Sequence, residues 1–270
     1  MARVHQAFSH CGRAMGNLPF PAMITGIFFW DAESRKLAKQ YVAEVAESGV
    51  PPSAMPPCLM YDCYLLKGKP GEGLAEYEQY AHDWVEVGKE VNLPVAVVPL
   101  GFDTQGRPAK NEMRAQAYLA LASGCKGVNW FRYESLKTMD PERWEEVRAI
   151  NQELAILGPT LIKLEKTENI ASISGGGGKQ FASGLVNTFQ HLETSRKYFF
   201  LASKDVFEDD LVTVTFKKTG LGYKPAYAKD CLTGAVLHLE NLGQRLGFRL
   251  SLPPGGGRLI ELGASRRWFG

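Results

Sequence analysis

The chain has 270 residues, of which 45% are hydrophobic, and its formal net charge is +2. This size suits one large or two modest globular domains, and a near-neutral charge without a basic block argues against nucleic acid as a partner. The longest apolar runs are too short to span a bilayer, and no positive segment followed by a hydrophobic core marks a signal peptide. We therefore expect a soluble protein that does not cross a membrane, and we assign it to no compartment.

Four apolar runs in the first part of the chain are each followed by a segment with helical periodicity. The runs cover residues 23–30, 58–63, 94–100 and 127–132, and the helical segments cover residues 31–49, 74–92, 111–123 and 141–161. Strands joined by helices of this length are parallel neighbours with right-handed crossovers. The sequence therefore predicts an α/β fold with about four βα units in one sheet. In such folds the active site lies at the carboxyl ends of the strands.

For two of these helices the apolar spacing predicts which face is buried. In the helix over 74–92 the predicted inner residues are Leu74, Tyr77, Ala81, Trp84, Val85 and Gly88. In the last helix, Leu154, Leu157 and Leu161 form the predicted inner stripe. We expect the change to antiparallel structure between Lys163 and Lys179.

The amino-acid sequence of these βα units resembles that of a known family. The segment NEMRAQAYLALASGCKGVNWFRY, followed by INQEL and GPTL, resembles the last two βα units of the (β/α)8 barrels of the glycoside hydrolase superfamily. The resemblance spans residues 22–262, is strongest over 94–161, and is closest to β-galactosidase-like barrel proteins of bacteria. It implies the C-terminal half of a TIM-type barrel, a carbohydrate substrate, and hydrolysis of glycosidic bonds by a carboxylate pair without a cofactor.

Four βα units are half of the eight that a closed barrel needs. Two explanations fit this shortage. The chain is a fragment of a longer enzyme, which we favour, or it is a half-barrel whose open edge is covered by a second copy in a homo-oligomer.

From Asn169 onward the period of the sequence changes to short alternating runs separated by turn residues. Residues 211–216 alternate clearly, with Val212, Val214 and Phe216 on one face. The sequence therefore predicts a partial TIM-barrel domain over 1–165 and an antiparallel β-sandwich domain over 166–270. The strings DCLTG and FRLSLPPGGGRLIEL resemble the small all-β domain that closes many barrel glycosidases, which implies a bracing role, with sugar binding as the alternative.

The first candidate site follows the run over 23–30. Asp31 and Glu33 lie where a barrel strand delivers side chains to the active face, next to Trp30. The resemblance implies a catalytic role for both carboxyl groups, and an aromatic neighbour raises the pKa of such a group. The alternative is that Asp31 caps the following helix.

The second candidate is Asp62, which ends another strand between Tyr61 and Tyr64. A sugar stacks its CH face on an aromatic ring while its hydroxyls bond to a carboxylate, so we predict catalysis by Asp62 and substrate binding by the two tyrosines. The alternative is a buried Asp62 bonded to neighbouring backbone or to Arg132.

One strand end departs from the family pattern. Many retaining glycosidases carry a nucleophilic glutamate where this chain has residues 98–102, and Asp103 is the first acid that follows. Asp103, Arg132 and Glu134 remain predicted substrate-binding residues. The missing glutamate favours a second hypothesis, a degenerate barrel that binds carbohydrate or has a structural role without catalysis.

The cysteines and histidines of the sequence do not indicate a metal site or a disulfide framework. The five cysteines lack CxxC spacing, which favours buried free thiols, and the five histidines are scattered along the chain. We therefore expect neither a metal ion nor a cofactor.

Overall fold

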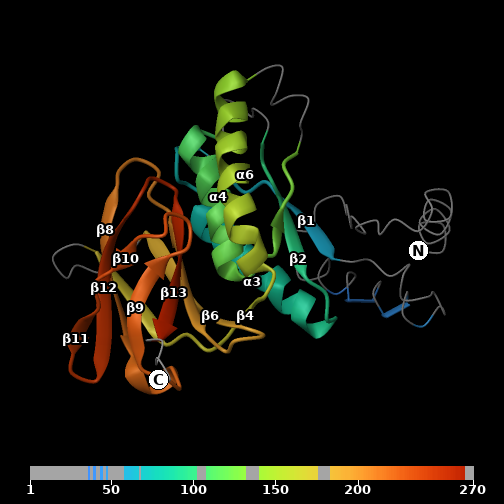
Figure 1. Ribbon diagram of the computed structural model, residues 1–270. Coiled ribbons are helices and arrows are strands. Elements are labelled where there is room, and N and C mark those ends of the chain that lie inside the picture. Colours follow the sequence, from blue (N-terminus) through green and yellow to red (C-terminus); the bar gives the residue numbers. More distant parts are fainter. Residues whose placement is uncertain are drawn as a thin grey trace.

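A computed structural model describes residues 58–66, 68–101, 108–131, 140–175 and 183–264, together with six helical positions between Lys36 and Glu47. The described part is a mixed α/β structure with one parallel sheet, two antiparallel sheets and three long helices (Figure 1). The strand predicted over 23–30 lies outside the described residues, whereas the six helical positions fall inside the helix predicted over 31–49.

The parallel sheet has the order β1-β2-β3 and consists of β1 (Leu59–Cys63), β2 (Val95–Pro99) and β3 (Gly127–Val128). Its register sets Asp62 opposite Val98. An isolated parallel bridge joins Leu100 to Phe131 beyond the regular strands. The predicted parallel order of these three strands is confirmed, but β3 is shorter than the expected run over 127–132 because regular pairing with β2 stops before that bridge.

Three helices accompany the sheet: α3 (Leu74–Glu90), α4 (Lys110–Ser123) and α6 (Pro141–Leu161). Helix α4 ends at Gly124, whose φ of 120° suits a residue without a side chain. Helix α6 begins after Asp140, whose carboxylate accepts a hydrogen bond from the Arg143 backbone N–H at 3.0 Å. Local capping signals therefore set these helix ends.

The buried faces of the helices agree with the pattern in the sequence. All six residues predicted on the inner face of α3 are buried. On α6, Leu157 and Leu161 are buried and Leu154 is half-buried. The apolar periodicity therefore identified the side of each helix that packs inward.

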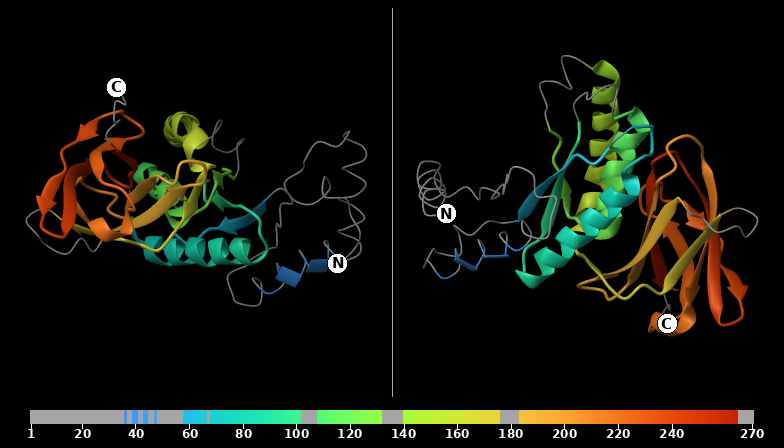
Figure 2. Two further views of the ribbon diagram at one scale, coloured as in Figure 1. Left: turned by 60° about the horizontal axis from the view of Figure 1, so that its bottom comes forward. Right: turned by 180° about the vertical axis from the view of Figure 1, so that it is seen from behind.

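Helix α4 lies between the parallel sheet and the antiparallel strands. The Tyr118 ring packs edge-on against Phe200, with centroids 6.2 Å apart, and the Asn187 side chain donates to the Ala122 carbonyl at 2.9 Å. One hydrophobic core therefore runs from β1 through α3 and α4 into the antiparallel region. Figure 2 shows from two further directions that the antiparallel strands gather at one end of the molecule, away from the parallel sheet.

The antiparallel region contains a six-stranded sheet, β10-β9-β13-β7-β6-β4, and a four-stranded sheet, β11-β12-β8-β5. Its strands are β4 (Leu164–Lys166), β5 (Ala171–Gly175), β6 (Gly184–His191), β7 (Lys197–Ser203), β8 (Asp210–Lys217), β9 (Pro225–Asp230), β10 (Val236–Leu237), β11 (Glu240–Leu242), β12 (Arg245–Leu252) and β13 (Gly257–Ala264). Regular antiparallel structure thus begins at Leu164, inside the expected span. The division into domains 1–165 and 166–270 stays a prediction.

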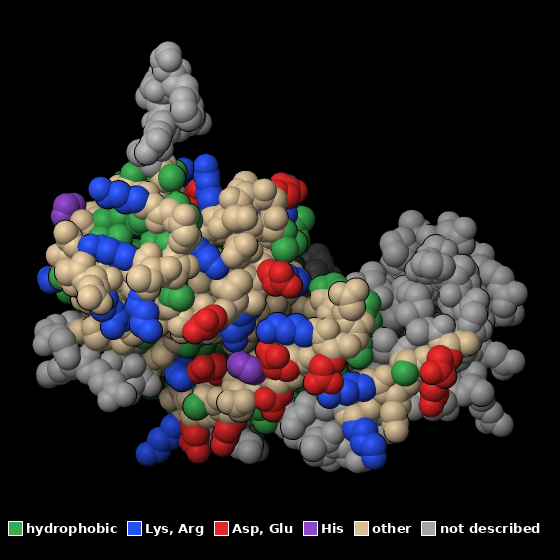
Figure 3. Space-filling model, turned by 90° about the horizontal axis from the view of Figure 1, so that it is seen from below, with side chains coloured by type: hydrophobic (Ala, Val, Ile, Leu, Met, Phe, Trp, Pro, Cys, Tyr) green, Lys and Arg blue, Asp and Glu red, His purple; other side chains and the backbone are tan. Residues whose placement is uncertain are grey.

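The two antiparallel sheets share a second core. Phe199 on β7 contacts Phe216 on β8 and Phe248 on β12, with ring centroids 4.9 and 6.3 Å apart. Along β8 the predicted inward residues Val212, Val214 and Phe216 are fully buried. Seen from below, acidic and basic side chains are interspersed around the core (Figure 3), in keeping with the near-neutral net charge.

Candidate functional site

Asp62 lies near the carboxyl end of β1, on the face of the sheet that turns away from the helices. Side chains alternate between the two faces of a strand, and Leu59, Tyr61 and Cys63 all belong to the core beneath the helices. Asp62 is only half-buried, on the opposite face. Burial raises the pKa of its carboxyl group above the ordinary value. A carboxyl group with a raised pKa keeps its proton to higher pH, which suits a general acid.

Two aromatic rings lie at the same end of the sheet. The centroids of the Tyr64 and Phe131 rings are 6.3 Å apart, with a tilt of 30° between the ring planes. Phe131 is 40% exposed, so part of its ring faces solvent. The pKa of Tyr64 is raised by burial and, in second place, by the Asp62 carboxylate. The Tyr64 hydroxyl therefore stays protonated, and its ring belongs to the same neighbourhood as Asp62.

The structure places Tyr61 elsewhere. Its side chain is fully buried, its ring stacks on Trp84 with centroids 5.4 Å apart, and its hydroxyl lies 3.7 Å from the Cys125 sulfur. Burial raises the pKa of Tyr61, with a further contribution from Cys125. Because Tyr61 points into the core beneath the helices, it does not share a face with Asp62, and we do not carry it into the proposed site.

The remaining predicted site residues lie outside the described residues. They are Trp30, Asp31, Glu33, Asp103, Arg132 and Glu134. Their roles stay predictions. Of the nine predicted site residues, Asp62 and Tyr64 are the two that the structure brings together.

Two polar residues on α4 support this edge of the sheet, and the sequence analysis missed them. The fully buried Glu112 accepts hydrogen bonds from the Gly71 and Ala109 backbone N–H groups, both at 2.8 Å. The fully buried Gln116 bonds both backbone groups of Leu100, where β2 ends. The i, i+4 spacing of Glu112 and Gln116, which places both on one face of α4, was the available signal.

No acidic residue lies at the end of β2 in the described part of the chain. Val98, Leu100 and Gly101 are buried, and Asp62 is the only acidic residue on the described residues of the three parallel strands and the segment that extends β3 to Phe131. A two-carboxylate mechanism therefore needs a second acid from another part of the protein.

In the described part, no three or more His, Cys, Asp or Glu side chains form a group that could hold a metal ion. The helices of this part are also too short or too polar to cross a membrane. The described cysteines, Cys58, Cys63, Cys125 and Cys231, are free.

No protein-family model and no curated protein matches the chain. Among solved structures it is similar to a GH27 β-L-arabinopyranosidase from Geobacillus stearothermophilus, with 14% identity, a TM-score of 0.47, and coverage of 87% of this chain and 54% of that one. It is also similar to the α-fucosidase of Thermotoga maritima, with 11% identity, a TM-score of 0.38 and coverage of 86% and 57%. For the α-amylase of Geobacillus thermoleovorans the identity is 10%, the TM-score 0.43, and the coverage 86% and 57%. The chain thus spans little more than half the length of these glycoside hydrolases.

Proposed function

We propose that this chain is the carboxyl-terminal half of a (β/α)8 barrel joined to a bracing β-sandwich, and that the complete barrel hydrolyses glycosidic bonds. The proposal rests on the chain's own residues, namely the βα order of the first part, the motifs between residues 94 and 161, and the side chains at the carboxyl edge of the parallel sheet. We further propose the β-galactosidase-like bacterial branch, on the same motifs.

One observation carries the proposal: a half-buried carboxyl group lies near the ring of Tyr64, which in turn packs near the exposed ring of Phe131. Asp62 influences the Tyr64 hydroxyl, and Tyr64 packs near Phe131. A sugar presents hydroxyls to a carboxyl group and a CH face to an aromatic ring, so these three side chains supply both kinds of contact. The raised pKa of Asp62 suits the general acid of a glycosidase. A second carboxylate would come from Asp31 or Glu33, or from outside the chain.

A non-catalytic carbohydrate-binding barrel is the second candidate function. The apolar end of β2, Val98 to Gly101, favours it, because retaining glycosidases of the family carry a glutamate there. In this alternative Tyr64 and Phe131 still bind sugar, and Asp62 serves only as a hydrogen-bond acceptor.

The test combines binding and turnover. The chain, and any longer protein that contains it, would be assayed with p-nitrophenyl β-galactoside and a panel of other p-nitrophenyl glycosides, and sugar binding would be followed by calorimetry. Asp62→Asn should lower turnover by about a hundredfold or more if Asp62 is the acid or base. Phe131→Ala should weaken sugar binding, while Phe207→Ala, a change at an exposed aromatic in the antiparallel region, should not.

The outcomes separate the two functions. Turnover that Asp62→Asn abolishes supports the glycosidase. Sugar binding without turnover in the longer protein supports the binding barrel. If neither protein binds a sugar, or Phe131→Ala and Asp62→Asn leave binding and turnover at wild-type levels, both functions are excluded for this site.

A further inference from the structure

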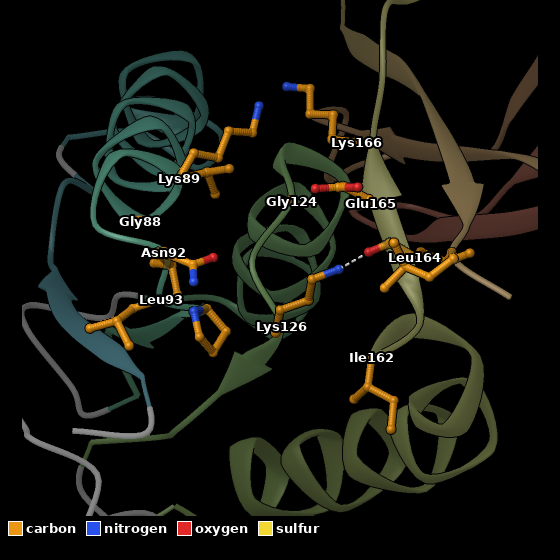
Figure 4. A pocket seen from close by; sticks show the side chains of 14 residues that line it. Gly88, Lys89, Asn92, Leu93, Gly124, Lys126, Ile162, Leu164, Glu165 and Lys166 are labelled. Carbon is orange, nitrogen blue, oxygen red and sulfur yellow. Dashed lines mark hydrogen bonds between the residues drawn. The ribbon is translucent and has the colours of Figure 1, made fainter. Parts of the chain in front are cut away.

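A cavity of about 230 Å³ lies at the amino ends of β2 and β3, the edge of the sheet opposite to Asp62. Its walls come from the end of α3, the start of β2, the residue before β3, the end of α6, and β4 (Figure 4). Together with Leu192, these walls come from four segments that are distant in sequence: residues 85–95, 124–126, 162–166 and 192. Ligand pockets for drug-sized molecules usually have about 300–1,000 Å³, so this cavity fits a smaller molecule.

The charges that line the cavity are mainly positive. Lys89, Lys126 and Lys166 come from three different segments, and Glu165 is the one acidic residue that lines it, a formal excess of two positive charges. In Figure 4 the ammonium groups of Lys89 and Lys166 extend to the same side of the cavity, and that of Lys126 reaches across it toward Leu164. Repulsion by Lys89 contributes to a lowered pKa of Lys166, after the larger effect of burial.

Lys126 and Lys166 each have more N–H donors than their hydrogen bonds to the protein use. Lys126 donates to the Leu161 carbonyl at 3.2 Å and to the Leu164 carbonyl, and Lys166 donates to the Ser123 carbonyl at 3.4 Å. Because these carbonyls lie at or near helix ends, part of the positive charge is stabilised by the helix dipoles. An ammonium group has three N–H donors, so both lysines keep unused ones. Within the described part, neither lysine forms an ion pair with a carboxylate.

Partly buried cations without a carboxylate partner are costly unless a counter-charge joins them. Burial lowers the pKa of Lys126 as well as that of Lys166. Lys89 is paired with Glu86, with 2.8 Å between nitrogen and oxygen. Lys126 feels the charge of Glu165, and Lys166 feels the charges of Glu86 and Glu78, but within the described part neither lysine forms an ion pair with them, so both charges are only partly compensated. An anion that enters the cavity would supply the missing counter-charge.

The rim of the cavity is apolar. Ile162 and Leu192 both line it and are 64% and 63% exposed. Leu93 and Pro94 add apolar surface on the opposite wall. A ligand that matches this lining carries a charged head and a short hydrocarbon portion.

We propose that this cavity binds a small organic oxyanion, with its carboxylate or phosphate group between Lys89 and Lys166 and its hydrocarbon portion against the apolar residues that line the cavity. The site uses none of the residues proposed to bind sugar. Its success or failure is therefore independent of the glycosidase proposal.

The experiment measures binding of sodium hexanoate, hexyl phosphate and neutral 1-hexanol to the full chain by calorimetry and thermal melting, at fixed ionic strength. At least one of the two anions should bind and raise the melting temperature, and hexanol should not. Lys166→Met and Lys89→Met should each weaken anion binding at least about tenfold, a loss of about 1.4 kcal/mol. Lys217→Met, at an exposed lysine of β8, is the matched control and should bind as the wild type does.

Lys89 is exposed at the end of α3, so its variant tests the site even if Lys166→Met fails to fold. Binding of only one of the two anions supports the site and identifies its head group. Absence of binding for both anions overturns the proposal, as does equal affinity in Lys89→Met, Lys217→Met and the wild-type protein.

Discussion

Gln116 holds both backbone polar groups of Leu100. Its side-chain amide donates to the Leu100 carbonyl, and its side-chain oxygen accepts from the Leu100 N–H, each at 3.1 Å. Gln116 is fully buried, so no water replaces these bonds. A single side chain of α4 thus completes the backbone bonding of β2 where the strand reaches its carboxyl edge.

Gln116→Leu should therefore destabilise the fold by about 2 kcal/mol or more, because a buried backbone group left without a partner costs about 1–3 kcal/mol. Urea unfolding measures the loss. The matched control is Gln152→Leu at an exposed position of α6, which should stay within about 0.5 kcal/mol of the wild type. Equal stability of the two variants would show that Leu100 does not depend on Gln116.

The pH dependence of stability should report on Asp62. Burial holds the pKa of its carboxyl group above the value in the unfolded chain, so the folded state binds this proton more tightly. The favourable contribution is complete below the unfolded pKa, about 4, and is lost as pH rises through the folded pKa. Solvent screens the half-exposed group, so the effect is modest.

Asp62→Asn removes this titration. The stability of the variant should therefore improve relative to that of the wild type as pH is raised from about 4 to about 7, the range above the unfolded pKa of an aspartate. Urea unfolding at several pH values gives the difference curve. A flat difference curve for Asp62→Asn would contradict the raised pKa of Asp62.

A buried ion-pair network joins α4 to α6. Arg114 pairs with Glu146, which is 3% exposed, at 2.7 Å and with Glu153 at 2.7 Å. Arg114→Met should destabilise the protein by about 3–5 kcal/mol, because among the described residues it leaves the buried Glu146 carboxylate paired only with the exposed Lys110, 3.5 Å away. The double variant Arg114→Met with Glu146→Leu should recover most of that loss.

Thermal or urea unfolding of the single and double variants tests the network. Arg148→Met, which removes an exposed pair with Glu145, should change stability by no more than about 1 kcal/mol. A loss for Arg114→Met as small as that of Arg148→Met would mean that Glu146 finds another partner.

The elements that the sequence predicted well depend on local signals. The helix over Leu74–Glu90 follows from apolar spacing, and β8 follows from alternation between Leu211 and Phe216. The neighbourhood of Asp62 and Tyr64 could be expected because the two residues are close in sequence at the end of one strand. These inferences need only the chain's own periodicity.

The features that the sequence did not reveal depend on contacts between distant segments. Tyr61 was predicted to bind substrate beside Asp62, yet helix α3 brings Trp84 against its ring and buries it in the core. Gln116 is an ordinary helix residue until packing buries it against Leu100. Strand β4 was missed because it has only three residues, and its pairing partner β6 lies about twenty residues away. Such features follow from tertiary packing rather than from local pattern.

Two glycines should respond differently to alanine. Gly257 begins β13, and an added Cβ would lie 2.6 Å from the Leu201 carbonyl oxygen and against the Tyr118 ring. The backbone cannot shift without cost, so Gly257→Ala should destabilise by about 1–3 kcal/mol. At Gly158, inside α6, an added Cβ would meet only its chain neighbour Pro159, which disfavours helical backbone in the residue before it. This cost offsets the gain in helix propensity, so Gly158→Ala should stay within about 0.5 kcal/mol of the wild type. Urea unfolding of both variants checks the pair, and a stabilised Gly257→Ala would disprove the close approach of α4, β7 and β13 that makes this glycine necessary.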